Sequence, residues 1–197
     1  MPITTHFRSD GGATWLNLLA TQGQSFGPRP VERLPTPSAA EEWLNHFGLP
    51  LSEAVSESGL GELVQLREAL RELAMATVAD REPSAEATTI VEAVAGNPAA
   101  PSFPSMLGDR SLSLQAALAA IAIQALVALA GPDRQYLTSC AEEDCRWVFL
   151  DTSGRRHWCP SPACASRGRV RAHRARRATA ERATADEPPA IERGREV

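Results

Sequence analysis

Four cysteines in the C-terminal third constrain this chain more than any other feature. They are the only cysteines among 197 residues, and their spacing is C-x4-C-x13-C-x4-C, formed by Cys140, Cys145, Cys159 and Cys164. Two closely spaced pairs that an intervening segment brings together supply the four-ligand tetrahedron that zinc prefers. Because four thiolates leave no coordination position open for water, the spacing predicts a structural zinc ion and not a catalytic one.

The residues of this stretch also fit roles that do not involve zinc. The cysteines are compatible with two redox disulfides or with four unrelated buried thiols, although a reducing cytosol favours metal binding. His157 and His173 are potential substitute ligands, but a surface position in a basic stretch also accounts for them. Trp147, Phe149 and Trp158 fit either the small core of a zinc module or stacking platforms for nucleic-acid bases.

The residues between and after the cysteines predict a hairpin followed by a helix. Residues 146–150 alternate as a strand, residues 152–154 contain turn formers, and residues 156–158 return as the second strand. From Pro162 the sequence is rich in Ala and Arg, with Gly168 as the one helix breaker before residue 188. This stretch has no apolar stripe, so we expect an exposed helix. The pattern is typical of a treble-clef or ribbon module.

Charge divides the chain into an acidic part and a basic part. Residues 1–145 hold 8 Arg and 18 Asp or Glu, a net charge of −10, whereas residues 146–197 hold 12 Arg and 6 acids, a net charge of +6. Such a separation predicts a basic segment that binds a polyanion while the acidic part stays away from it. DNA is the favoured partner, and RNA, an acidic protein surface and a merely solvated helix are the alternatives. The candidate contacts are Arg155, Arg156, Arg167, Arg169, Arg171, Arg174, Arg176 and Arg177.

The residues before the cysteines predict a mainly helical body. Leucines at three- and four-residue steps mark residues 60–80 as an amphipathic helix, with Arg67 and Arg71 among the charged residues of a solvated face. Residues 13–21 form an apolar segment that fits either a helical turn or a buried strand. Residues 24–38 contain four prolines, so we expect no regular structure there.

Further helices follow this proline-rich segment. Ser38 and Glu41 match a capping box at the start of a short helix, and Pro83 and Ser84 restart a helix that ends near residue 96. Residues 99–108 are rich in Pro and Ser, which predicts a loop. Residues 111–130 are hydrophobic nearly all round, which predicts a central helix that is covered on every side. Residues 114–130 are too short and too rich in Ala for a membrane span, and they suit a core or a homodimer interface.

The expected architecture is therefore mainly α, with a small C-terminal module of four cysteines. We expect a helical domain over residues 1–133, the zinc module over 134–182 and a disordered tail over 183–197. The N-terminus lacks an apolar signal segment, which favours a cytoplasmic protein. No paired carboxylates, nucleophile elbow or phosphate loop is visible, so we do not expect an enzyme. A small-molecule effector in the helical body is compatible with this organisation.

Residues 140–177 resemble the CGNR zinc-finger family, through the strings CRWVFLDTS and RRHWC and a cysteine that opens an Arg-rich helix. Members carry an N-terminal ABATE domain, and LPTPSAAEEWLNHFGL, LREALRELA and GPDRQYLTSCAEEDC resemble it. The resemblance implies a zinc-containing transcription regulator. In this chain Ala165 and Ser166 replace the Gly and Asn of the family tetrapeptide. Leu16 to Thr21 replaces an Asp followed by Asn-Thr, so a ligand site made by that polar pair is expected to be lost.

Overall fold

Hydroxyl side chains set the starting points of the helices in the body. In the computed structural model, which describes residues 7–97 and 111–185, Thr36, Ser56, Ser84 and Ser113 each accept a hydrogen bond from the backbone amide three residues later, at 3.1–3.2 Å. Each bond satisfies an amide that has no partner inside the helix. These caps precede α2 (Pro37–His46), α3 (Glu57–Val78), α4 (Ala85–Ala95) and α6 (Leu114–Ala130).

The predicted capping box at Ser38 is wrong. Thr36 is the capping residue, and Pro37 occupies the first helical turn, where its missing amide hydrogen costs nothing. The carboxylate of Glu41 does not bond within its own helix but accepts a hydrogen bond of 2.6 Å from the backbone amide of Val55. Glu41 therefore fixes the loop that leads into α3.

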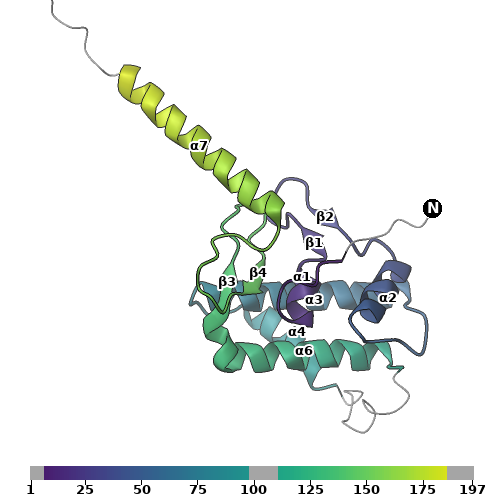
Figure 1. Ribbon diagram of the computed structural model, residues 1–197. Coiled ribbons are helices and arrows are strands. Elements are labelled where there is room, and N and C mark those ends of the chain that lie inside the picture. The colour runs from purple at the N-terminus through teal and green to yellow at the C-terminus, as the bar shows by residue number, and fades with distance from the viewer. Residues whose placement is uncertain (1–6, 98–110, 186–197) are drawn as a thin grey trace, which may run out of the picture.

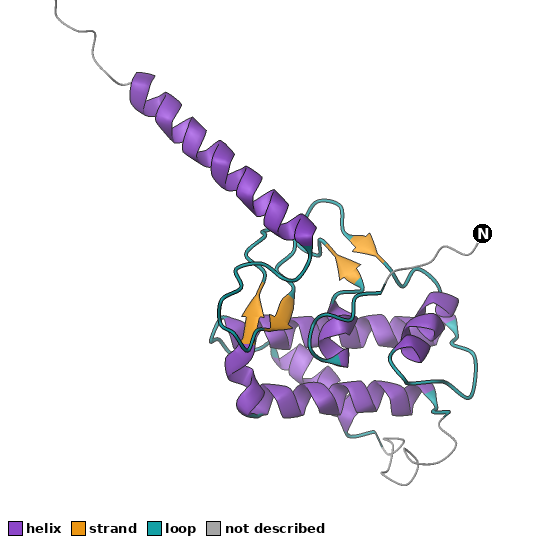
Figure 2. Ribbon diagram, in the orientation of Figure 1, coloured by secondary structure: helices purple, strands orange, loops and turns teal. Residues whose placement is uncertain are grey.

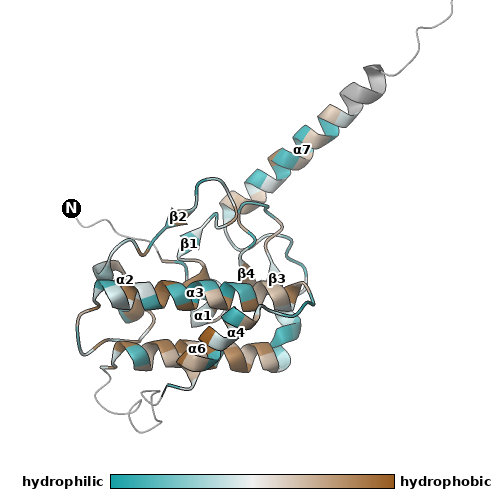
Figure 3. Cartoon of the chain, turned by 180° about the vertical axis from the view of Figure 1, so that it is seen from behind, coloured by the Kyte–Doolittle hydropathy of each residue, from teal (hydrophilic) through white to brown (hydrophobic). Residues whose placement is uncertain are grey.

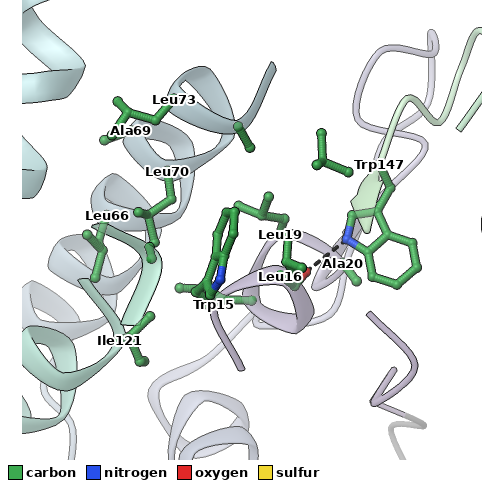
Figure 4. Packing of buried hydrophobic residues seen from close by; sticks show 14 of the residues in the cluster. Trp15, Leu16, Leu19, Ala20, Leu66, Ala69, Leu70, Leu73, Ile121 and Trp147 are labelled. Carbon is green, nitrogen blue, oxygen red and sulfur yellow. Dashed lines mark hydrogen bonds between the residues drawn. The ribbon is translucent and has the colours of Figure 1, made fainter. Parts of the chain in front are cut away.

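The core of the body lies between α3 and α6, with the short helix α1 (Thr14–Leu19) between them (Figures 1 and 4). Trp15 is fully buried near Leu66, Leu70 and Ile121. The apolar segment predicted over residues 13–21 is thus a helix rather than a strand. Every residue from 15 to 19 is buried, and all of them except Asn17 are apolar.

Helix α6 is covered on its inner side only, so the prediction that it is enclosed on every side is wrong. Alanines fill much of its inner face and allow close approach to the neighbouring helices, as expected for side chains without rotamers to order. Ile123 and Val127 on the outer face are 41% and 68% exposed. Brown apolar residues run along this helix in Figure 3. No helix among the described residues is long and apolar enough to span a membrane.

The proline-rich segment contains a short element of sheet, contrary to expectation. Strand β1 (Gln22–Gly23) pairs antiparallel with β2 (Val31–Glu32), with Gln22 opposite Glu32. The prolines border this pairing without interrupting it, because only two residues of each strand take part. The pairing places Glu32 over α3, where its carboxylate reaches Arg67.

The C-terminal module is a hairpin followed by a long helix (Figure 2). After the 3-10 helix η1 (Pro132–Tyr136), strand β3 (Leu137–Ser139) pairs antiparallel with β4 (Val148–Leu150). The sequence correctly predicts β4, but it names the wrong partner. Residues 156–158 form no strand, and β3, which precedes the first cysteine, takes that place. Helix α7 (Pro162–Ala185) then projects away from the rest of the molecule (Figure 1).

The hairpin and the helical body share one hydrophobic core. The indole Nε1 of Trp147 donates a hydrogen bond of 2.8 Å to the carbonyl oxygen of Leu16 in α1 (Figure 4). The amide of Leu150 donates to the carbonyl of Gly11 at 3.0 Å. A Cβ at Gly11 would lie only 2.8 Å from the Trp147 ring, so only glycine allows this close approach. The predicted loop at 99–108 and the tail beyond residue 185 lie outside the described residues.

Candidate metal centre and basic helix

The first two cysteines lie in the loop that joins β3 to β4. The backbone amides of Cys145 and Arg146 both donate to the carbonyl of Glu142, at 2.9 and 3.0 Å, and they close a tight turn. Arg146 has a φ of +43°, the left-handed region that non-glycine residues seldom adopt. This conformation returns the chain from the turn to β4, so that Cys140 and Cys145 face the same side.

The second pair completes a buried cluster of four sulfur atoms. Cys159 lies in the loop before α7, and Cys164 lies in the first turn of that helix. All four sulfurs are within 4.8 Å of one another, and all four residues are buried free thiols. A tetrahedron with Zn–S bonds of about 2.3 Å has edges of about 3.8 Å, so this donor set fits a zinc ion. Neither His157 nor His173 belongs to the cluster among the described residues.

The sulfurs strongly perturb one another's protonation. The contact with Cys145, and to a lesser extent that with Cys164, lowers the pKa of Cys140 to about 7, although the contact with Cys159 acts to raise it. Contacts with Cys140, and then with Cys145 and Cys164, also lower the pKa of Cys159. The contact with Cys140 in turn raises the pKa values of Cys145 and Cys164. Four thiolates this close repel one another, and a divalent cation held between them would offset that repulsion and replace the protons.

Two arginines surround the cluster with positive charge. Arg8 Nη1 lies 3.6 Å from the sulfur of Cys159, and Arg167 Nη2 lies 3.4 Å from the sulfur of Cys164. The Arg8 guanidinium also lies over the ring of Trp147, 4.1 Å from its centroid. N–H···S contacts of this kind stabilise thiolates and orient them for a metal. Because Arg8 comes from the N-terminal segment, the centre is completed by residues far outside the cysteine motif.

Arg171 fixes the base of α7 to the cysteine turn, which is the turn of residues 140–146 that contains the first two cysteines. Its guanidinium forms ion pairs of 3.0, 2.9 and 2.6 Å with Glu142, Glu143 and Asp144. Glu142 is only 1% exposed and is also 3.5 Å from the Nε of Arg167. These three carboxylates, although they are part of the acidic region of the chain, face the arginine helix directly. Arg171 and Arg167, which the sequence predicts as nucleic-acid contacts, therefore position α7 within the molecule.

The other predicted contacts on α7 lie on its exposed surface. Every side chain from residue 172 to 179 is exposed, and teal hydrophilic residues recur along this helix in Figure 3. Arg169 bonds back to the carbonyl of Ala165 and lies 5.9 Å from the centroid of Trp158. At 100° per residue, Arg169, His173 and Arg176 fall on the side opposite Arg167, Arg171 and Arg174.

Arg155 and Arg156 are exposed in the loop between β4 and Cys159. Asp151 shapes this loop, since its carboxylate accepts hydrogen bonds from the amides of Ser153 and Arg156 at 3.0 and 2.8 Å. Hydrogen bonds from Ser153 and then from the Arg156 amide lower the pKa of Asp151. Arg155 and Arg156, two of the predicted nucleic-acid contacts, thus lie at the end of an ordered turn.

Comparison with known families finds two matches along the chain. Residues 12–132 match the model of the ABATE family, described as "Putative stress-induced transcription regulator". The chain belongs to the ABATE family. Residues 137–177 of this ABATE protein match the CGNR zinc finger, and a search of curated proteins found no match. Ala165 and Ser166, which replace the family Gly and Asn, lie within regular helix, so the cysteine cluster forms without them.

The same ABATE domain contains a buried ionic cluster at a position that the sequence pattern assigns to a solvated face. Arg67 is 1% exposed; its guanidinium pairs with both carboxylate oxygens of Glu32, at 2.7 and 2.8 Å, and donates to the hydroxyl of Thr21 at 3.0 Å. Arg71 donates to Gln22 and to the carbonyl of Leu19. The burial of Arg67 could have been predicted from its position, because Arg67 falls on the apolar stripe of α3.

Asn17 and Thr21 have structural roles in this domain. The Asn17 side chain accepts a hydrogen bond of 2.9 Å from the amide of Gly11, and the Thr21 hydroxyl donates to the carbonyl of Leu18 at 2.7 Å. Both side chains are buried. The polar residues that remain in this segment are therefore used to hold α1 in place. The loss of a ligand site here stays a prediction.

Proposed function

We propose that this ABATE protein is a transcription regulator that binds DNA through the exposed surface of α7. The observation that carries the proposal is the projecting helix itself. Between residues 162 and 179 it contains six arginines and no acidic residue, and its 24 residues have a length of about 36 Å. The positive charges of these arginines repel one another in water. A row of phosphates neutralises them, and binding is favoured by the release of counterions from the nucleic acid.

The dimensions of the helix favour DNA over RNA. A helix with side chains fits the major groove of B-form DNA, which is about 12 Å wide, whereas the corresponding groove of A-form RNA is deep and narrow. Arg169 and Arg176 lie on the side of α7 away from the cysteine turn and are the favoured contacts. Arg171 acts indirectly, because its guanidinium is already held by three carboxylates. The proposal assigns the chain a binding role and no catalytic step.

The metal centre supports this role by holding the helix at its base. Cys164 is part of α7, and Arg167 contacts the sulfur of that residue. Zinc bound by the four cysteines would fix the first turn of α7 relative to the hairpin. The helix would then approach DNA as a rigid arm, without the entropic cost of ordering a free peptide.

The experiment is a titration of the zinc-loaded full chain with duplex DNA at a series of salt concentrations. Changing Arg169 and Arg176 together to Gln should reduce the slope of log affinity against log salt by about 1.8, because about 0.9 is lost for each phosphate contact. Arg29 and Arg134, both exposed on the body, provide the matched double Gln control and should leave the slope unchanged.

Three outcomes would contradict the proposal. The first is no retention of DNA at low salt. The second is an unchanged salt slope in the Arg169/Arg176 double variant, and the third is an equal effect of the body control. Tighter binding to duplex RNA than to duplex DNA would redirect the proposal to RNA. Salt-dependent binding to an acidic protein in the absence of any nucleic-acid binding would favour the protein-interaction alternative.

A further inference from the structure

A cleft lies where α3 meets the cysteine turn, and its lining combines charged and apolar side chains. Its volume is about 460 Å³. Residues of α3 and of the segment directly after it line one side, and Phe26 of the proline-rich segment and Arg146 of the cysteine turn line the other. The lining residues are Phe26, Glu68, Arg71, Glu72, Met75, Ala79, Arg81 and Arg146.

The charges of the cleft leave one positive charge uncompensated. Glu68 pairs with Arg71, and also with Arg67 just behind the wall, and Glu72 pairs with Arg81 at 2.7 Å. The third lining cation, Arg146, pairs with no carboxylate within the part of the chain that the structure describes. Its guanidinium instead lies 5.5 Å from the centroid of the Phe26 ring. Three arginines against two glutamates therefore suit a monoanion better than a dianion.

The apolar part of the lining indicates that the rest of the ligand is apolar. Phe26 is a large hydrophobic residue with 45% of its surface exposed, and Met75 and Ala79 add further apolar lining. Phe26 is held there, because its amide donates to the carbonyl of Asp144 in the cysteine turn at 3.1 Å. Ordered exposure of an aromatic ring beside an arginine is typical of a binding site, in which a few polar groups orient an apolar ligand.

We propose that this cleft binds a small aromatic monocarboxylate. Its carboxylate pairs with Arg146, and its ring packs against Phe26 and Met75. A nucleotide or inorganic phosphate would bring a second negative charge toward Glu68 and Glu72, so the carboxylate is favoured. The site is distinct from the metal centre and from the exposed surface of α7. It does not depend on DNA binding, and the two proposals can fail separately.

The test uses benzoate and 3-phenylpropionate as probes on the zinc-loaded full chain without nucleic acid, followed by amide NMR. We expect saturable shifts at the backbone amides of Phe26, Met75 and Arg146. Benzamide, the neutral analogue of benzoate, should bind at least about tenfold more weakly, since a hydrogen bond between charged groups is lost. This comparison requires only the unmodified chain.

Two variants locate the carboxylate and the ring. Arg146→Gln should weaken benzoate binding by about tenfold or more, and Phe26→Ala should weaken benzoate and benzamide alike. Arg134→Gln is the matched control, because Arg134 is an exposed arginine 3.8 Å from Asp80 and outside the cleft. Zinc content and the helical circular dichroism signal should stay unchanged in all three variants.

Several outcomes would overturn this inference. They are dissociation constants above about 10 mM for both acids, equal affinity for benzamide, or shifts confined to the apolar cleft of Phe47, Ile121 and Ile123. A fourth is an Arg146→Gln variant that loses DNA affinity but keeps benzoate affinity, which would make Arg146 a phosphate contact. Failure of DNA binding alone leaves the carboxylate site intact.

Discussion

At the scale of single residues, the buried guanidinium of Arg67 is the most demanding feature of the body. An unpaired cation in an apolar interior is costly, and the two oxygens of Glu32 compensate it in a bidentate pair. Burial acts to raise the pKa of Glu32, but hydrogen bonds from Arg67 and from the amides of Leu34 and Arg33 hold it below its ordinary value of 4.5. Glu32 thus ties the proline-rich segment to α3.

Replacing Glu32 by Gln should lower the free energy of unfolding by about 2–4 kcal/mol at pH 7, because Arg67 stays buried with only the half-exposed Glu68 as its counter-charge. Urea unfolding followed by circular dichroism measures this difference. Glu42→Gln, an exposed glutamate on α2, is the control and should change the stability by less than about 0.5 kcal/mol.

The same pair has a defined pH dependence. Because the pKa of Glu32 is lowered in the folded state, its contribution is fully present above 4.5 and is lost as the pH falls through the folded pKa. The stability curves of the native chain and of Glu32→Gln should therefore converge in acid. A constant difference down to about pH 2 would show that the charge of Glu32 does not stabilise the fold.

At the scale of elements, the glycines of two helices differ in how closely their surroundings pack against them. A Cβ at Gly168 in α7 would lie 2.4 Å from Nε1 of Trp158, so this glycine lets the indole pack against the helix. A Cβ at Gly61 in α3 would have no neighbour within 4 Å. Gly168, which the sequence presents only as a helix breaker, is thus a packing site next to the metal centre.

Gly168→Ala should therefore destabilise the chain by about 1–3 kcal/mol, because a rigid ring must move away. Gly61→Ala should stabilise it by up to about 1 kcal/mol through helix propensity alone. Urea unfolding measures both changes, and the NMR signal of the Trp158 indole N–H should shift in Gly168→Ala only. Equal stabilisation by the two substitutions would contradict the packing seen around Trp158.

At the scale of the whole molecule, the C-terminal zinc module (the finger) and the helical body depend on each other for stability. Trp147, Phe149 and all four cysteines belong to the same buried cluster as Trp15 and the leucines of α3. Arg8 adds a contact from the N-terminal segment to the sulfur of Cys159. The metal centre is consequently part of the support of the helical body.

Removing the metal should therefore destabilise the entire chain. Treatment with a zinc chelator, or the substitution Cys159→Ser, should lower the midpoint of thermal unfolding by more than about 10 °C, measured on the helical signal, with finger and body unfolding in one transition. Ser161→Ala beside the centre is the control. A body that unfolds at the same temperature with and without metal would show that the two parts are independent.

The sequence alone determines the elements whose causes are local. Cysteine spacing defines the ligand set, hydroxyl residues define most helix starts, and the absence of an apolar stripe identifies α7 as an exposed helix. Even the error at Ser38 concerns which hydroxyl caps α2, not whether the helix exists. These features follow from neighbours within a few residues, which is why they can be predicted.

The tertiary structure decides which distant residues meet. The burial of Arg67 beneath Glu32 and the capture of Arg171 by three carboxylates join segments that are far apart along the chain. The strand partner of β4 is nearer in the sequence, but it precedes the first cysteine and has no pattern that marks it as the partner. A charged residue looks the same in the sequence whether it faces water or a counter-charge. Long-range packing excludes water around Arg67 and places carboxylates around Arg171, but it leaves the outer arginines of α7 in solvent. Only the tertiary structure therefore separates the arginines that stabilise the molecule from those that stay exposed.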